Sequence, residues 1–258
     1  MKIKTFLLCT TMCALMAACS SEDAAALSDN RAASRQTAET LLKEINRSNP
    51  LSSIGIMHNE ELDGIMKRYS SLTRSNTEFS IICDSIRSQA ISDYMATGDT
   101  LDISPSVFAV TYDSVALPSA LISHQMRFRS GYSPTAHGIE LYACVAELDN
   151  IFEDNDNDLA SLLSRLKDVQ DIAGQITIES ARNMVYLCVS VAANSLTYWN
   201  DVMNTPDYIQ KDYKSWKDVA KADVSAGKAA HNLLGNSFWG WVGTAIIGGG
   251  ASAIKYFW

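Results

Sequence analysis

The sequence predicts a mainly α-helical, bundle-like domain with an irregular middle segment and a glycine-rich apolar helix or hairpin at the C-terminus. Three observations support this class. Apolar residues recur at helical spacing along most of the chain. Proline is scarce, with five among 258 residues. The segment 177–202 is apolar nearly all round in its middle, as expected of a central core helix.

The first part of the domain contains three predicted helices. Residues 34–46 form the first, which ends at Asn49-Pro50 because the residue before a proline disfavours helical geometry. A second is predicted over 59–69 with Asn59 as its N-cap, and a third over 76–97.

The middle of the chain has the least regular pattern. Residues 100–135 are predicted to be irregular, with a short strand over 107–115. Helical spacing returns over 138–152, and the acidic stretch 153–158 is predicted to cap another helix over 159–173.

These elements suggest four segments along the chain. They are a signal peptide at 1–18, a flexible tether at 19–33, a helical domain at 34–210, and a basic helix with a small-residue-rich apolar tail at 211–258.

The N-terminus resembles the signal of a bacterial lipoprotein. Lys2 and Lys4 precede an apolar run, and Leu15-Met16-Ala17-Ala18-Cys19 resembles a lipobox, in which the cysteine becomes acylated. The resemblance implies a palmitate-bearing, membrane-anchored protein of the cell envelope, at the outer membrane or the cell surface. The alternative is an ordinary signal peptide cut near Ala18, which would leave Cys19 as a free thiol.

Charge and cysteine content exclude some classes of protein. Loss of residues 1–18, which carry two lysines and no acid, would change the net charge from −8 to −10, and this argues against a nucleic-acid partner. Cys83, Cys144 and Cys188 would remain besides Cys19. They form no C-x-x-C pair and are predicted to be small buried residues, so we expect no metal and no cofactor.

Several separated patches of the chain follow the pattern N-P-x4-G-x2-H-N-x2-L-D, with S-x2-Y-W and W-x2-V-A-x-A-D further along. The matching residues are Asn49-Pro50, Gly55, His58-Asn59, Leu62-Asp63, Ser195, Tyr198-Trp199, Trp216, Val219-Ala220 and Ala222-Asp223. These patches resemble a group of bacterial secreted proteins and lipoproteins of the kind found in Bacteroidota. The resemblance implies a common fold and supplies neither an activity nor a catalytic residue.

His58, Asn59 and Asp63 form the candidate polar site. A histidine beside Glu60, Glu61 and Asp63 could act as a general base or a metal ligand, although the H-E-x-x-H pattern is absent. The alternative is structural, with Asn59 as a helix cap, the two glutamates at the helix N-terminus and His58 in a turn hydrogen bond.

The acidic stretch 154–158 imitates the start of a calcium loop. Leu159 and Arg165 stand where that loop requires glycine and glutamate, so a helix cap or solvated loop is favoured over a calcium site.

The C-terminal segment combines a basic helical face with an uncharged stretch over 238–254 that is rich in small residues. Such stripes let helices approach closely in membranes, and the flanking aromatic residues resemble interfacial belts. Contact with a membrane or partner is one interpretation, a buried glycine-rich hairpin is a second, and a tail removed by processing is a third. The residues concerned are Lys214, Lys217, Lys221, Lys228, Gly240, Gly248, Gly249, Trp239, Trp241 and Trp258.

Three functions therefore compete. The leading prediction is a non-enzymatic envelope lipoprotein that binds an unknown protein partner. The second is a bacteriocin-like antagonist with a membrane-active tail. The third is a hydrolase that uses His58 and nearby carboxylates.

Overall fold

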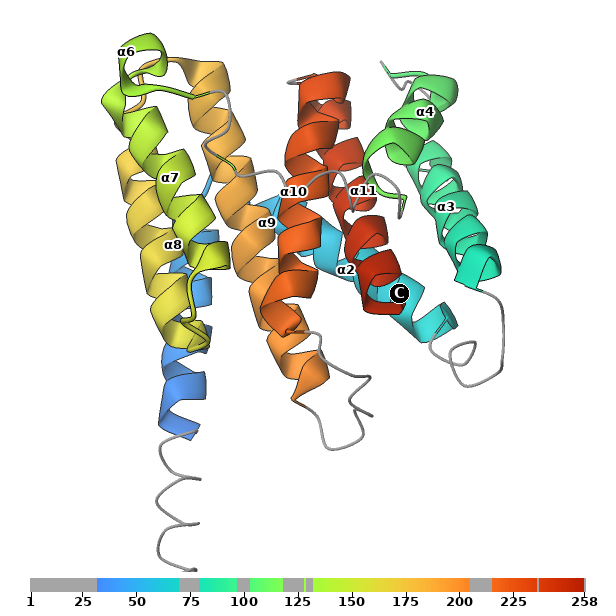
Figure 1. Cartoon of the computed structure of the whole chain (residues 1–258), viewed down its shortest axis with the longest axis horizontal. Coiled ribbons are helices and arrows are strands. Elements are labelled where there is room, and N and C mark those ends of the chain that lie inside the picture. Colours follow the sequence, from blue (N-terminus) through green and yellow to red (C-terminus); the bar gives the residue numbers. More distant parts are fainter. Residues whose placement is uncertain are drawn as a thin grey trace, which may run out of the picture.

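The computed structural model describes residues 32–69, 79–96, 103–117, 128, 132–204, 215–235 and 237–257. These residues form ten helices and no strand, which confirms the mainly α-helical class (Figure 1). Besides a helix over 32–48, they are α2 (Ser52–Tyr69), α3 (Phe79–Ala96), α4 (Pro105–Val115), α6 (Pro134–His137), α7 (Ile139–Glu153), α8 (Leu159–Ala173), α9 (Glu179–Met203), α10 (Trp216–Leu234) and α11 (Phe238–Phe257).

The helices pack around α9, α10 and α11, which lie in the middle of Figure 1. Helix α9 contacts α2, α7, α8 and α10, while α11 contacts α2, α3, α4 and α10. In the view of Figure 1, α7 and α8 lie on one side of this centre and α3 and α4 on the other. Helices α10 and α11 therefore share one core with α2 and α9.

Two central helices are buried on nearly every side. Residues 187–196 of α9 are all buried, in agreement with the predicted central core helix. Residues 242–254 of α11 are buried as well, and α11 runs through Gly248, Gly249 and Gly250 as one continuous helix. The cost of three helical glycines, about 1 kcal/mol each, is offset by close packing against neighbouring helices.

Helix α2 begins at Ser52, seven residues before the predicted start, so Asn59 lies inside the helix and the prediction of an N-cap there was wrong. The side chain of Asn49 explains the earlier start, because its Oδ1 accepts a hydrogen bond of 2.8 Å from the backbone N–H of Leu51. Gly55 would ordinarily weaken a helix, but here it lets α9 approach closely.

The strand predicted over 107–115 was also wrong, because these residues belong to α4. Ser104 caps the helix by accepting a hydrogen bond from Val107 N, and Pro105 occupies the first turn, where proline is tolerated. Phe108, Tyr112 and Val115 are buried at helical spacing, whereas Val107 and Val110 are exposed.

The bounds predicted for the other helices agree more closely with the structure. Helix α8 has the predicted bounds, and Asp158 caps it by accepting a hydrogen bond of 3.2 Å from Ser161 N. The signal peptide, Cys19, Lys214 and Trp258 lie outside the described residues.

Candidate functional site

His58 on α2 faces Asp223 on α10 in the interior of the bundle. Its Nε2 lies 3.0 Å from Asp223 Oδ1, and both side chains are 0% exposed. Burial alone would lower the pKa of His58. The charge of Asp223 and the hydrogen bonds to Asp223 and Asn59 instead raise the pKa above its ordinary value.

Hydrogen bonding fixes the protons on the His58 ring. Asn59 Nδ2 donates to the carbonyl of Asn194 at 2.9 Å, so Asn59 Oδ1 faces His58 Nδ1 at 3.0 Å as an acceptor. His58 Nδ1 must therefore carry a proton. Among the described residues, His58 Nε2 and Asp223 Oδ1 have no other polar partner, so a proton between them is needed to keep two lone pairs from facing each other. The raised pKa of His58 favours placing this proton on the ring, as an imidazolium.

The second oxygen of Asp223 binds two donors on α9. Ser195 Oγ donates to Asp223 Oδ2, and Trp199 Nε1 donates to the same atom at 3.3 Å. Trp199 also stacks on Tyr256 of α11, with ring centroids 5.0 Å apart. The resulting His58–Asp223 cluster consists of His58, Asn59, Asn194, Ser195, Trp199 and Asp223, and joins α2, α9 and α10.

Glycines bring the surrounding backbones close to the His58–Asp223 cluster. A Cβ placed on Gly248 of α11 would lie 3.1 Å from Asp223 O and 3.4 Å from the His58 ring. On α2, a Cβ at Gly55 would lie 2.5 Å from the carbonyl oxygen of Ser190, closer than such atoms approach. Gly55 N instead donates to Ser190 Oγ at 3.1 Å.

Several residues of the sequence pattern that begins at Asn49 have polar contacts inside the fold. Asn49 Nδ2 donates to Gln170 Oε1 at 2.8 Å and to the carbonyl of Tyr186 at 2.9 Å. Gly55, His58, Ser195, Trp199 and Asp223 meet at the contacts described above. The pattern, which was read from separated patches of sequence, therefore converges on the junction of α2, α9 and α10.

This arrangement differs from a serine hydrolase triad, although it contains serine, histidine and aspartate. In a triad the histidine lies between the nucleophile and the carboxylate, so that it can take the proton of the hydroxyl. Here Ser195 donates directly to Asp223, on the oxygen opposite His58. All three side chains are 0% exposed, and their contacts join α2, α9 and α10.

The other carboxylates proposed to work with His58 do not converge on it. Glu60 is exposed, and Asp63 pairs with Lys67 one turn along α2. Burial and the charge of Asp93 on α3 raise the pKa of Glu61 to about 8. Asp223, Ser195 and Trp199 were not singled out as site residues. One sequence signal could have found Asp223, because it shares a buried face of α10 with Val219, Ala226 and Ala230.

The acidic loop after α7 is occupied by a cation of the protein itself. Lys217 Nζ lies 2.9 Å from the carbonyl of Asp154, 2.8 Å from its Oδ1 and 2.8 Å from the carbonyl of Asp156. Partial burial would raise the pKa of Asp154, but hydrogen bonds from Lys217 and Arg165 lower it below its ordinary value. Across the described residues, no three His, Cys, Asp or Glu side chains are grouped as a metal site requires.

Two further lysines of the predicted basic face also have partners within the chain. Lys221 pairs with Glu153. Lys228 Nζ donates to the carbonyl of Phe128 at 2.5 Å and lies over the rings of Phe128 and Tyr132, 5.5 and 5.2 Å from their centroids. Burial lowers the pKa of Lys228.

The small residues of α11 face other helices of the bundle. A Cβ at Gly240 would lie 3.0 Å from the carbonyl oxygen of Leu234 on α10, and one at Gly249 would lie 3.4 Å from the carbonyl oxygen of His58 on α2. Trp241 is half-buried against the core. Within the described part of the chain, no helix has both the length and the apolar character needed to cross a bilayer.

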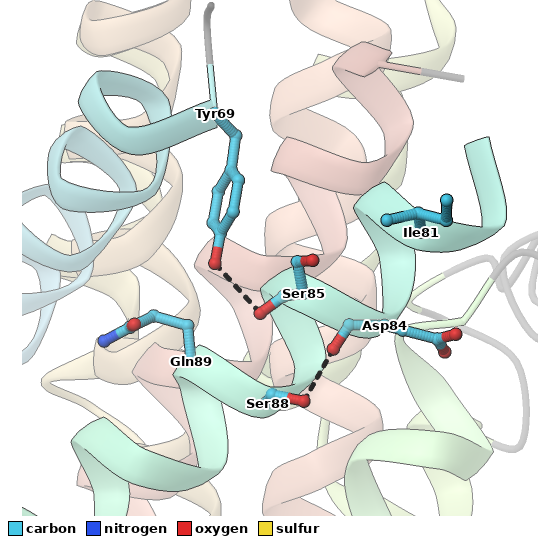
Figure 2. A pocket seen from close by; sticks show the side chains of 6 residues that line it. All are labelled: Tyr69, Ile81, Asp84, Ser85, Ser88 and Gln89. Atoms are coloured by element: carbon cyan, nitrogen blue, oxygen red, sulfur yellow. Dashed lines mark hydrogen bonds between the residues drawn. The ribbon is translucent and has the colours of Figure 1, made fainter. Parts of the chain in front are cut away.

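A cavity of about 450 Å³ lies beside α3, where the end of α2 approaches it (Figure 2). Tyr69 of α2 donates to the carbonyl of Ser85 at 3.0 Å, and Ser88 donates to the carbonyl of Asp84 at 2.8 Å. Ile81 and Gln89 complete the lining. None of the site residues predicted from the sequence lines this cavity.

The three cysteines of the helical body are free and buried. Burial is the largest cause of the raised pKa of each thiol, to about 11 for Cys83, about 12 for Cys144 and about 11 for Cys188. Such thiols are unreactive in the folded protein.

Comparison of the chain with family models, with curated proteins and with solved structures found no match.

The pH dependence of stability should report the charged state of His58. Because its folded pKa is raised above 6.5, its contribution is fully present below pH 6.5 and is lost as the pH rises through the folded pKa. We expect the difference in unfolding free energy between wild type and His58→Gln to shrink across that range. Urea unfolding between pH 5 and 9 measures this, and a constant difference would show that His58 is neutral throughout.

Proposed function

We propose that this protein is a lipid-anchored protein of the bacterial cell envelope and that its helical body binds a partner without catalysing a reaction. The observation that carries the proposal is the signal-like N-terminus, in which Cys19 follows Leu15-Met16-Ala17-Ala18. Cleavage before Cys19 would leave that residue as the acylated N-terminus.

The length of chain after Cys19 is compatible with an anchored body. Residues 19–31 precede the first described helix, and 13 residues can span at most about 45 Å. The body could therefore stand clear of the lipid headgroups while remaining tethered.

The contacts of its polar residues favour a binding role for the helical body over a hydrolase or a membrane-active protein. His58, Ser195 and Asp223, which together could suggest a hydrolase, are bonded to one another in the core. The basic residues Lys217, Lys221 and Lys228, which could suggest a membrane-active tail, bind groups within the chain. Because these polar groups already have partners within the chain, we expect the unknown partner to bind the exposed surface of the helical body.

Metabolic labelling tests the anchor. Cells that express the wild-type protein in the presence of labelled palmitate should incorporate label into it, and membrane fractionation should recover it with the envelope. Cys19→Ala should abolish both, because acylation needs the thiol of that residue.

Cys83→Ala is the matched control, since Cys83 is buried on α3 and should not affect labelling. Label that persists in Cys19→Ala, or an unlabelled wild-type protein found in the cytosol, would refute the proposal.

A further inference from the structure

One face of α3 forms a wall of the cavity shown in Figure 2. Ile81, Asp84, Ser85 and Ser88 follow one another at intervals that place them along a single helical stripe. Tyr69 lines the cavity from the end of α2, where its hydroxyl donates to the carbonyl of Ser85 at 3.0 Å. With a volume of about 450 Å³, the cavity has room for a long side chain of another molecule.

The polar side chains on this stripe present hydrogen-bond acceptors. The carboxylate of Asp84 is exposed and has no ion-pair partner among the residues that the structure describes. Arg87, the one basic residue of α3, is bound instead to Asp113 of α4, with Nη2 2.7 Å from Oδ2. Ser88 Oγ donates its proton to the carbonyl of Asp84 at 2.8 Å, so its lone pairs can still accept. A positively charged group with several N–H donors therefore fits this wall.

Ile81 supplies an apolar surface next to the acceptors. It is 52% exposed, and in Figure 2 its side chain and that of Asp84 extend to the same side of α3. Arginine has an apolar stem and a planar head with five N–H donors. The stem can cover Ile81 while the head binds the carboxylate of Asp84 through two parallel hydrogen bonds. The net charge of −8 on the chain attracts a basic partner over longer distances.

We propose that this cavity receives an arginine side chain of a protein partner, whose guanidinium group pairs with Asp84 and donates to Ser88 while its stem packs on Ile81. The assignment rests on the proposed binding role of the helical body and locates one contact of that role on α3. Lysine fits less well, because its ammonium group is a point charge that cannot form two parallel hydrogen bonds with a carboxylate.

An NMR titration of the purified full-length protein, labelled with nitrogen-15, tests the site. The probes are N-acetyl-arginine methylamide and its uncharged counterpart N-acetyl-citrulline methylamide. With the arginine probe we expect saturable shifts of the backbone amides of residues 81–89 and a dissociation constant of about 1 mM. The citrulline probe should bind at least about tenfold more weakly, because it lacks the charge.

Asp84→Asn keeps the shape of the side chain and removes its charge, so it should weaken binding of the arginine probe at least about tenfold. Asp168→Asn is the matched control, since Asp168 is an exposed aspartate on α8, and it should bind as wild type. Ser88→Leu keeps the charge of Asp84 but fills part of the cavity, and it should weaken binding as well. Both Asp84 and Ser88 are exposed, so these variants should fold.

Equal binding of the two probes, shifts that do not saturate, or unchanged affinity in Asp84→Asn would overturn the proposal. Unchanged affinity in Ser88→Leu would overturn it too, because the probe would then be held by surface charge and not by the cavity. Palmitate labelling at Cys19 does not involve α3, so a failure of this site is distinguishable from a failure of the lipid anchor.

Discussion

Asp223→Asn should lower the free energy of unfolding by about 3–5 kcal/mol, because it leaves the buried imidazolium of His58 without its counter-charge. The loss is a large fraction of the 5–15 kcal/mol that is typical of a folded domain. Asparagine has nearly the same shape as aspartate, so the change tests the charge and not the packing. Urea denaturation followed by far-UV circular dichroism at pH 6 measures the difference.

Asp218→Asn is the matched control for this experiment. Asp218 lies on the same helix, five residues earlier, and is exposed. Its replacement should change the unfolding free energy by no more than about 0.5 kcal/mol. If Asp223→Asn is as mild as Asp218→Asn, His58 and Asp223 do not form a buried ion pair.

Two glycines of α2 should respond in opposite directions to replacement by alanine. At Gly55 the added Cβ would lie 2.4–2.6 Å from Ser190 and Asn194, and one of the atoms met is a backbone oxygen that cannot turn aside. We expect α2 and α9 to be forced apart, with a loss of about 1–3 kcal/mol or more.

At Gly64 a Cβ meets nothing within 4 Å, and the residue is exposed in the middle of the same helix. Gly64→Ala should therefore stabilise the protein by about 0.5–1 kcal/mol through its higher helix propensity. Thermal unfolding of the two variants measures both effects. Changes of the same sign would show that α2 does not approach α9 closely at Gly55.

Much of the helical architecture can be predicted from apolar spacing. The spacing alone indicates α8 and the buried middle of α9, because one face or the whole circumference of each helix is apolar. Errors occurred where a tertiary contact overrides a local signal. Helix α2 passes through Gly55, which is unfavourable in isolation but is required by the neighbouring α9. Helix α4 contains β-branched residues that resemble a strand, yet Ser104 and Pro105 start a helix.

The candidate site could be predicted only in part. His58 stood out because it is followed by several polar residues, but its partner Asp223 lies 165 positions along the chain. Nothing local to either residue reveals the pairing, since it depends on how α10 packs against α2. The partners of the α10 lysines could not be predicted either. Helical spacing places these lysines on one face, but it does not show that Lys217 contacts the acidic loop.

The protonation of His58 is the most direct test of the account, because it decides whether His58 and Asp223 form a buried ion pair that joins α2 and α10. Nitrogen-15 NMR of histidine-labelled protein at pH 7 resolves both ring nitrogens. We predict that both nitrogens of His58 carry a proton that exchanges slowly with water, as in a buried imidazolium bonded to Asn59 and Asp223. A ring that titrates near pH 6.5 and exchanges rapidly with solvent would contradict the account.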